Sequence, residues 1–339
     1  METLLIPARG VALPIVEASQ VSAARMAAQR MARDLGFDET RVGRVAIAVT
    51  EAATNIVRHG GGGTLTARAI SRGDTVGIEV LAIDAGRGMK SFPASAVDGV
   101  SSAGSAGTGL GAIQRLTDEF DVYTRPDAGT LLRFAFWGGE APAPDSGYEV
   151  GAIAVPYPGE TACGDAWEMV RDASGITLVV ADGLGHGPDA AHASGAAVET
   201  LRRHPAEPPI RLLDRMHGRL RSTRGAAVSI VRHDAASPSL AYAGVGNVAV
   251  CVATGAERKT MVAHNGIVGH NVHRSQEYRY PWPADALLVA HSDGLESHWD
   301  LAAFPGLAVA HPSLIAAMLF RQHSRQRDDV VVVVVRQRR

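Results

Sequence analysis

The stretch Ala181-Asp182-Gly183-Leu184-Gly185-His186-Gly187 places an aspartate directly after an apolar run that begins at Val179. A short apolar run of this kind is typical of a buried strand. The glycines that follow allow a tight turn and a close approach of the backbone. A carboxylate at this point is held by the sheet while its charge lies at the rim. The stretch therefore predicts a strand end that presents a fixed negative charge.

Two further aspartate groups stand at the ends of apolar runs. Asp293 follows the run Leu287 to Ala290, and the pair Asp328-Asp329 precedes Val330 to Val335. If these strand ends meet at one rim, their oxygens are the ligands that Mg²⁺ or Mn²⁺ prefers. The pattern predicts metal-assisted hydrolysis, with the valine run as a central strand.

Composition sets the outer limits. A chain of 339 residues with 46% hydrophobic and 20% charged residues is typical of an ordinary two-domain soluble protein. A net charge of -2 gives no reason to expect a nucleic acid or an anionic membrane as partner. Met1 to Gly10 does not resemble a signal peptide, so we expect a cytoplasmic protein. The isolated Cys163 and Cys251 indicate neither a zinc site nor a disulfide framework.

A domain boundary is predicted near the middle of the chain. The segment Gly138-Gly-Glu-Ala-Pro-Ala-Pro-Asp-Ser146 suits neither helix nor strand. It separates a strand-like run that ends at Trp137 from another that begins near Tyr148. We therefore expect an α/β protein with two domains, over residues 1–137 and 148–339, joined by a linker over residues 138–147.

In the first domain, Asp38 is a suitable N-cap for a helix that runs to about Arg58. Glu51 and Asn55 point the same way, one helical turn apart. A carboxylate can accept a proton from a hydroxyl nucleophile, and an amide oxygen can ligate the Mg²⁺ of a nucleotide. Alone, such a pair more often belongs to a solvated helix face. The expected apolar face comprises Val42, Val45, Val49, Ala52, Ala53 and Ile56, and the other face Arg44, Ala48, Glu51, Asn55 and Arg58.

A strand over residues 76–83 is expected to end in Asp84-Ala-Gly86-Arg-Gly88. The carboxylate there can accept a hydrogen bond from an exocyclic amine, and the glycines let the backbone approach a flat ring. A Gly/Ser/Ala-rich segment, Asp98 to Gly107, indicates a mobile loop, either a simple surface excursion or an active-site lid, as long loops in compact domains often are. It leads into Gly107-Thr-Gly109-Leu-Gly111, which opens a helix whose free N–H groups can bind phosphates.

Together these three motifs resemble the N, G1 and G2 boxes of the GHKL ATPase/kinase superfamily, over about residues 10–137. The resemblance implies a Bergerat α/β sandwich that binds ATP with Mg²⁺. It implies Glu51 as general base, Asn55 as Mg²⁺ ligand and Asp84 as the adenine-binding carboxylate. No helix pair with a phosphoacceptor histidine precedes the N box, so the domain resembles the anti-sigma serine kinases. The other residues expected around the nucleotide are Gly86, Gly88, Gly107, Gly109, Gly111 and Thr130.

The second half, over about residues 148–336, is similar to PPM-type, SpoIIE-like serine/threonine phosphatases. The motifs that carry this similarity are Gly164-Asp165, Asp182-Gly-Leu-Gly-His-Gly187, Arg224-Gly-Ala-Ala-Val-Ser229, Gly244-Val-Gly-Asn247, Ser292-Asp-Gly294 and Arg327-Asp-Asp329. The fold implied is two antiparallel sheets packed face to face and flanked by helices. As in the small stressosome phosphatases of this family, there is no long insert between Gly187 and Ser292.

This second resemblance implies two Mn²⁺ or Mg²⁺ ions. Asp182 would bridge them, the Gly183 carbonyl would bind one, and Asp293 and Asp328 would complete the ligands of the second. Asp165 would act in the outer shell or ligate directly. Asp329 could replace Asp328, because the two are adjacent. Two such ions activate water for attack on a phosphomonoester.

The leading hypothesis is a bifunctional regulator of partner switching. The first domain would phosphorylate a serine or threonine of a STAS-domain stressosome or anti-anti-sigma protein, and the second would remove that phosphate from the same or a related partner. One alternative is that the first domain binds ATP and sequesters a partner without phosphorylating it. Another is that ATP gates the phosphatase. Glu51 argues against sequestration, since nucleotide binding alone requires no base.

Overall fold

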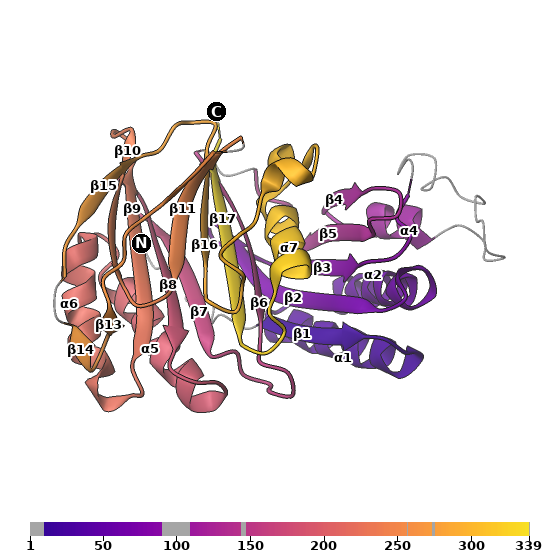
Figure 1. The fold of residues 1–339 in the computed structure, drawn as a ribbon. Helices are drawn as coiled ribbons and strands as arrows, with labels where there is room; N and C mark the ends of the chain where they lie inside the picture. Colours follow the sequence, from indigo (N-terminus) through magenta and orange to yellow (C-terminus); the bar gives the residue numbers. More distant parts are fainter. Residues whose placement is uncertain (1–9, 90–108, 144–146, 256, 273–274, 339) are drawn as a thin grey trace. The chain divides into compact units, whose positions relative to one another are not determined.

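The computed structural model describes residues 10–89, 109–143, 147–255, 257–272 and 275–338. The chain forms two compact units, Met1–Asp145 and Ser146–Arg339, which Figure 1 colours from indigo to yellow along the sequence. No helix among the described residues is both long enough and apolar enough to cross a membrane.

The first unit is a two-layer α/β sandwich. Its five-stranded sheet has the order β1-β2-β3-β5-β4, and every neighbouring pair is antiparallel. The helices supply apolar side chains to a core on one face of this sheet. The strands are β1 Gly10–Ile15, β2 Gly63–Arg72, β3 Thr75–Asp84, β4 Glu119–Thr124 and β5 Thr130–Trp137, and the helices are α1 Ala18–Asp34, α2 Glu39–Asn55 and α4 Gly109–Leu116.

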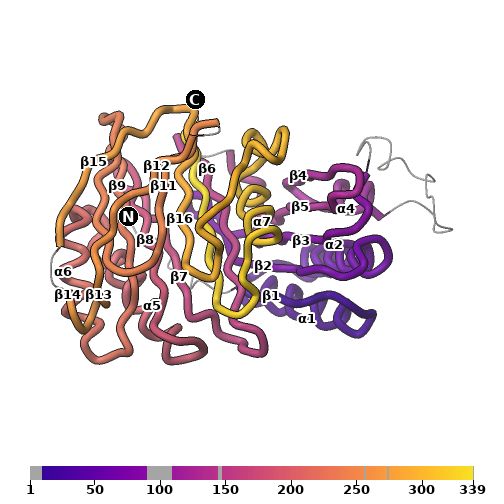
Figure 2. Tube along the Cα trace, viewed as in Figure 1, coloured from indigo at the N-terminus to yellow at the C-terminus, as the bar shows by residue number. Residues whose placement is uncertain are grey.

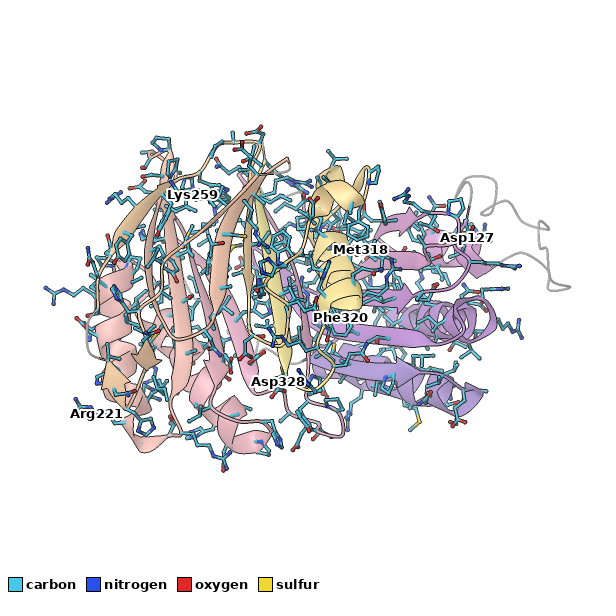
Figure 3. All side chains as sticks on the ribbon, in the orientation of Figure 1. Asp127, Arg221, Lys259, Met318, Phe320 and Asp328 are labelled. Atoms are coloured by element: carbon cyan, nitrogen blue, oxygen red, sulfur yellow. The ribbon has the colours of Figure 1, made fainter. Side chains whose placement is uncertain are left out.

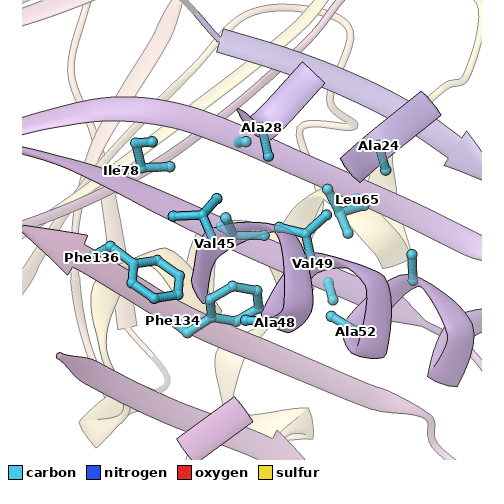
Figure 4. Close-up of a cluster of buried hydrophobic side chains, with 14 of the residues drawn as sticks. Ala24, Ala28, Val45, Ala48, Val49, Ala52, Leu65, Ile78, Phe134 and Phe136 are labelled. Carbon is cyan, nitrogen blue, oxygen red and sulfur yellow. The ribbon is translucent and has the colours of Figure 1, made fainter. Parts of the chain in front are cut away.

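Helix α2 lies at the centre of this unit. Asp38 caps it as predicted, because its Oδ1 accepts the backbone N–H of Arg41 at 2.7 Å. Val45 and Val49 pack onto the sheet side chains Leu65, Ile78, Phe134 and Phe136 (Figure 4). The prediction that Ala48 lies on the polar face is wrong: it is buried. Helix α2 contacts α1, α4 and the sheet. These neighbours bury more of the helix surface than the single predicted apolar face.

The predicted end of this helix also needs correction. The α-helix ends at Asn55, and Ile56–Gly60 form one π-helical turn, η1, instead of continuing to Arg58 as α-helix. A π-turn accommodates an extra residue and is frequent at functional sites. Here it carries the backbone of His59 and Gly60 against Asp84 and Gly86.

The second unit contains two five-stranded antiparallel sheets that share one core, and the path of the chain between them can be followed in Figure 2. The first has the order β15-β10-β9-β8-β7 and the second β12-β11-β16-β17-β6. Their strands are β6 Tyr148–Val155, β7 Asp165–Arg171, β8 Gly175–Gly183, β9 Ala226–Asp234, β10 Ser239–Val245, β11 Ala249–Thr254, β12 Glu257–Thr260, β15 Tyr278–Pro281, β16 Leu287–His291 and β17 Val330–Gln337, with a small hairpin of β13 Gly266–Ile267 and β14 Asn271–Val272.

Helices flank this sandwich, which confirms the predicted fold class. Helices α5 Pro188–Arg203 and α6 Pro209–Arg219 cover the outer face of the first sheet, and α7 Pro312–His323 packs on β6 and β17. Short 3₁₀ turns, η2 Leu220–Ser222, η3 Leu301–Ala303 and η4 Leu307–Val309, complete the unit.

The surroundings of strand β8 explain its continuous apolar sequence. Leu178 and Val180 point into the core between the sheets, whereas Val179 and Ala181 pack under α5 and α6. Because successive strand residues point to opposite faces, a strand covered on both sides needs a continuous apolar run. The same run fixes Asp182 at the strand end, where the apolar cover stops.

Candidate functional site

The second unit brings the strand-end aspartates together. Asp165, the first residue of β7, lies directly opposite Asp182 of β8 in the antiparallel ladder. Asp293 follows β16, and Asp328, labelled in Figure 3, lies with Asp329 just before β17. Strands β16 and β17 are neighbours, so their aspartates come from one end of the second sheet.

Burial and mutual repulsion perturb these acids. Burial first, and then the negative charges of Asp293 and Asp328, raise the pKa of Asp182 to about 7. The pKa of Asp165 is raised well above its ordinary value, first by burial and then by Asp182 and Asp329. Burial and Asp328 also raise the pKa of Asp293. Carboxylates that repel one another in this way are relieved by binding protons or a cation.

Neutral side chains orient two of these carboxylates. Asn247 donates a hydrogen bond from Nδ2 to Asp293 Oδ2 at 2.6 Å. The Ser292 hydroxyl bonds to Asp165, and its oxygen accepts the N–H of Val331 at 3.0 Å. Both partners lie far from their aspartates in sequence. The phosphatase-like motifs include these two residues but indicate no role for them, because only the packing of the strands shows the pairing.

Asp328 and Asp329, the adjacent pair before β17, act on different carboxylates. Asp328 acts electrostatically on Asp182 and Asp293, whereas Asp329 acts on Asp165 as well as Asp182. Asp329 is buried, and its Oδ1 accepts the backbone N–H of Tyr157 at 2.8 Å. The two aspartates therefore have different surroundings. Which of them ligates an ion stays a prediction.

The aspartate cluster fits divalent ions. Asp165 Oδ2 and Asp329 Oδ2 are both buried and have no hydrogen-bond partner among the described residues. Orphaned carboxylate oxygens of this kind are costly unless a cation takes the place of a hydrogen bond. Within the described ranges, no three His, Cys, Asp or Glu side chains are yet gathered closely enough to hold an ion.

Glycines let the cluster form. A methyl group at Gly183 would lie 2.1 Å from the Ala190 carbonyl oxygen, and one at Gly164 would lie 2.6 Å from Asp329 Oδ2. A side chain at Gly183 would push α5 away from β8, and one at Gly164 would push Asp329 away from the start of β7. Gly183 is thus required for packing beside any part its carbonyl takes in metal binding.

His186 lies in the turn after Asp182 but outside the acidic cluster. Its ring stacks on Tyr157, with centroids 4.3 Å apart, and its Nδ1 lies 3.0 Å from Glu160 Oε1. Since Tyr157 also binds Asp329 through its backbone, this stack links the turn to the cluster. The geometry agrees with a residue that shapes the loop.

In the first unit, the structure brings Glu51, Asn55 and Gly109 together. A methyl group at Gly109, the first residue of α4, would lie 3.0 Å from Glu51 Oε2 and 3.6 Å from the side-chain nitrogen and oxygen of Asn55. Asn55 Nδ2 is buried without a hydrogen-bond partner in the described part of the chain. Gly111 is buried within the same helix. Gly107 and the predicted lid before it lie outside the described residues.

Asp84 and Thr130 also meet. Asp84 Oδ1 accepts backbone N–H groups from Gly86 at 2.9 Å and from Thr130 at 3.2 Å, which fixes the carboxylate at the end of β3. A methyl group at Gly86 would lie 2.2 Å from the His59 carbonyl oxygen, so the η1 turn forms a wall beside Asp84. The η1 turn is not predicted from the sequence, since no sequence signal distinguishes a π-turn from continued α-helix.

Gly88 is required by its backbone conformation. Its φ is +58°, and a methyl group there would lie 1.9 Å from the Arg125 carbonyl oxygen. Only glycine is accommodated at such a position. The turn after Asp84 therefore packs directly on the turn before β5.

Comparisons with known proteins find a family match in each half of the chain. Residues 16–136 match the histidine kinase-like ATPase domain family, and residues 172–338 match the stage II sporulation protein E (SpoIIE) family. The serine/threonine-protein kinase RsbT of Bacillus subtilis (strain 168) is 30% identical over 117 residues, which cover 34% of this chain and 88% of RsbT. The phosphoserine phosphatase RsbX of the same organism is 25% identical over 138 residues, which cover 40% of this chain and 69% of RsbX.

Solved structures give the same result for the fold. A chain from a study of the bacterial stressosome has a TM-score of 0.52 and 32% identity, covering 56% of this chain and 99% of its own length. RsbX in complex with magnesium has a TM-score of 0.51 and 20% identity, covering 57% of this chain and 98% of its own. The latter likeness shows the fold alone.

The chain is therefore a fusion of a kinase-like ATPase domain with a PPM-type phosphatase domain. Its first unit belongs to the family of the serine/threonine kinase RsbT, and its second is a SpoIIE-type domain homologous to the phosphatase RsbX.

Substitutions of Asp84 and Glu51 in the first unit should have separable effects. We expect Asp84→Asn to weaken ATP binding, because the fixed carboxylate of Asp84 is expected to contact the adenine ring. Glu51→Ala should leave ATP binding nearly intact and lower phosphotransfer about a hundredfold or more. Calorimetry with ATP and a kinase assay on both variants check this. An equal loss of ATP affinity in the two would show that the roles are wrongly divided.

The acidic cluster also makes a prediction about pH. Asp182 has its pKa raised from 3.8 to about 7, so the folded state binds more protons than the unfolded state between these values. Stability of the metal-free protein should then fall as pH rises through this range. Thermal unfolding in EDTA between about pH 5 and pH 8 checks this. Asp182→Asn should flatten the dependence, and an unchanged slope in that variant would contradict the assignment.

Proposed function

We propose that this protein both adds and removes phosphate on serine or threonine residues of a STAS-domain partner. The observation that supports the proposal is that one chain joins two units, and that in each unit the candidate site residues come together. RsbT is a serine/threonine kinase and RsbX a phosphoserine phosphatase, and this chain joins a relative of each. A STAS-domain partner is supported by the resemblance to stressosome kinases and phosphatases, and by a 32% identical chain from a study of the bacterial stressosome.

In the phosphatase unit, the aspartate cluster would hold two Mn²⁺ or Mg²⁺ ions, with Asp182 between them. Bound ions would supply the Lewis acidity and activated water that phosphomonoester hydrolysis needs. The protein's own contribution is orientation: Asn247 fixes Asp293, and Ser292 fixes Asp165. The nearest thiol is no alternative nucleophile, because burial and the neighbouring Asp165 raise the pKa of Cys163 well above its ordinary value.

In the kinase unit, Asp84 would bind the adenine amine, and Asn55 would ligate the Mg²⁺ that accompanies ATP. Glu51 would accept the proton of the partner's hydroxyl as its oxygen attacks the γ-phosphorus. The proximity of Gly109 to Glu51 and Asn55 supports this, because it puts the phosphate-binding end of α4 beside the base. The ADP oxygen leaves as the new phosphoester bond forms.

Two alternative functions give different results in one experiment. The full-length chain is incubated with radiolabelled ATP and the STAS-domain proteins encoded near its gene, with and without Mn²⁺. Label on a partner that disappears when ATP is removed supports the proposal. ATP-dependent binding without label would indicate sequestration. Phosphatase activity that changes with ATP, again without label, would indicate gating.

A further inference from the structure

Two exposed aliphatic side chains lie beside the proposed catalytic acids. The large hydrophobic side chains that the described part of the chain leaves exposed include Met26, Ile47, Leu184 and Val309. Ile47 stands one helical turn before Glu51, and Leu184 stands two residues after Asp182. A single exposed aliphatic group is ordinary, but one that stands with an exposed arginine beside an active site is a candidate contact for a protein substrate.

On the kinase unit, the exposed stripe follows helix α2. Arg44, Ile47 and Glu51 occupy positions i, i+3 and i+7, which fall on one helix face. Arg44 is exposed, and 52% of Ile47 is accessible to solvent. Burial of Val45 and Val49 against the sheet fixes the rotation of the helix and so directs this stripe outward. A segment that delivers a hydroxyl to Glu51 would pass along Ile47 and Arg44.

The phosphatase unit carries the same pair of side-chain types. Leu184 is 51% exposed, and its N–H donates to the Gly225 carbonyl at 3.0 Å, which holds the loop before β9 beside the turn. Arg224 precedes that glycine and lies against Gly185. Its ion pair with Asp189 is 2.6 Å long but exposed on both sides, so it is weak and exchangeable. Leucine and arginine thus stand at the rim beside Asp182.

We propose that the Arg44–Ile47 pair and the Leu184–Arg224 pair dock one and the same partner segment. That segment carries the phosphorylated serine or threonine with an aliphatic side chain and an acidic side chain close to it. The inference rests on the proposed function, since only a shared partner must fit both sites. The segment differs between the two reactions by its phosphate alone, so both rims need the same chemistry around it. An apolar contact with a charged neighbour supplies affinity and orientation together.

The first experiment truncates each aliphatic side chain in the full-length chain. Leu184→Ala should lower kcat/KM for a phosphorylated STAS partner about fivefold or more, and leave hydrolysis of p-nitrophenyl phosphate unchanged. Ile47→Ala should lower phosphotransfer to the same partner by a similar factor and leave ATP affinity unchanged. Met26→Ala and Val309→Ala are matched controls, because both side chains are at least as exposed yet lie elsewhere in their units.

The second experiment tests whether one partner residue meets both arginines. Arg44→Glu and Arg224→Glu should each lower activity on the partner. A single Asp or Glu of the partner, replaced by Lys, should restore both. Restoration by two different partner residues, or by none, would overturn the shared-segment proposal. A change in the oligomeric state of Ile47→Ala or Leu184→Ala would show instead that the surface joins copies of this chain.

Activity of the wild-type chain on a STAS partner distinguishes an error in the docking surface from an error in the proposed function. If the wild-type chain acts on no STAS partner yet hydrolyses p-nitrophenyl phosphate, the proposed partner class is wrong and the docking inference falls with it. If the wild-type chain acts on a partner, and Ile47→Ala and Leu184→Ala act as well as their controls, only the docking inference is wrong.

Discussion

Asp182→Asn and Asp293→Asn should each abolish nearly all metal-dependent phosphatase activity. Both carboxylates belong to a cluster whose members raise one another's pKa, so each supplies negative charge that an amide cannot replace. Divalent ions contribute several kcal/mol of charge stabilisation in such reactions, which corresponds to a loss of about a hundredfold or more in rate. The measurement is hydrolysis of a phosphorylated STAS partner with Mn²⁺ or Mg²⁺, and EDTA should abolish it in the wild type.

The matched control is Asp285→Asn. Asp285 is an exposed aspartate in the turn before β16, at the opposite end of the strand that leads to Asp293. It should retain wild-type activity. Hydrolysis at the wild-type rate by Asp182→Asn would exclude the two-metal assignment, whatever the control shows.

Opposed activities on one partner should set a steady level of phosphorylation. Covalent linkage keeps both sites at high effective concentration around any partner that one unit has bound. With ATP and Mn²⁺ supplied, Asp293→Asn should raise the phosphorylated fraction of the partner above the wild-type plateau. Glu51→Ala should bring it towards zero, and Glu39→Ala, at the exposed start of the same helix, should leave it unchanged.

The time course of partner phosphorylation, followed by phosphate-affinity gels, checks this expectation. If Asp293→Asn abolishes phosphatase activity but leaves the plateau of every STAS partner unchanged, the two units act on different substrates. A plateau that Glu51→Ala fails to lower would exclude the first unit as the source of the phosphate.

Much of the fold could be predicted because local patterns and the final environment agree. The run before Asp182 indicates a buried strand since β8 is covered on both faces, and Asp38 indicates a helix start that its capping bond confirms. The two family resemblances added the order of layers, which periodicity alone does not give.

Other features depend on contacts between distant segments. The pairing of Asp165 with Asp182 follows from strand register, and the bond from Asn247 to Asp293 follows from the packing of two loops. Neither is encoded in a short stretch. Ala48 was misplaced for a similar reason: its burial depends on which elements surround α2, and an alanine fits a buried or an exposed position equally well.

The pairing of β6 with β17 has a consequence for how the protein is made. β6 is the first strand of the phosphatase unit, yet its hydrogen-bonding neighbour is β17, the last strand of that unit. Asp328 and Asp329, which directly precede β17, are synthesised equally late. Because domains generally fold in order as they leave the ribosome, the ATPase unit can complete its sheet while the phosphatase unit still waits for its closing strand. Each newly synthesised molecule therefore acquires its nucleotide-binding half before its phosphate-removing half.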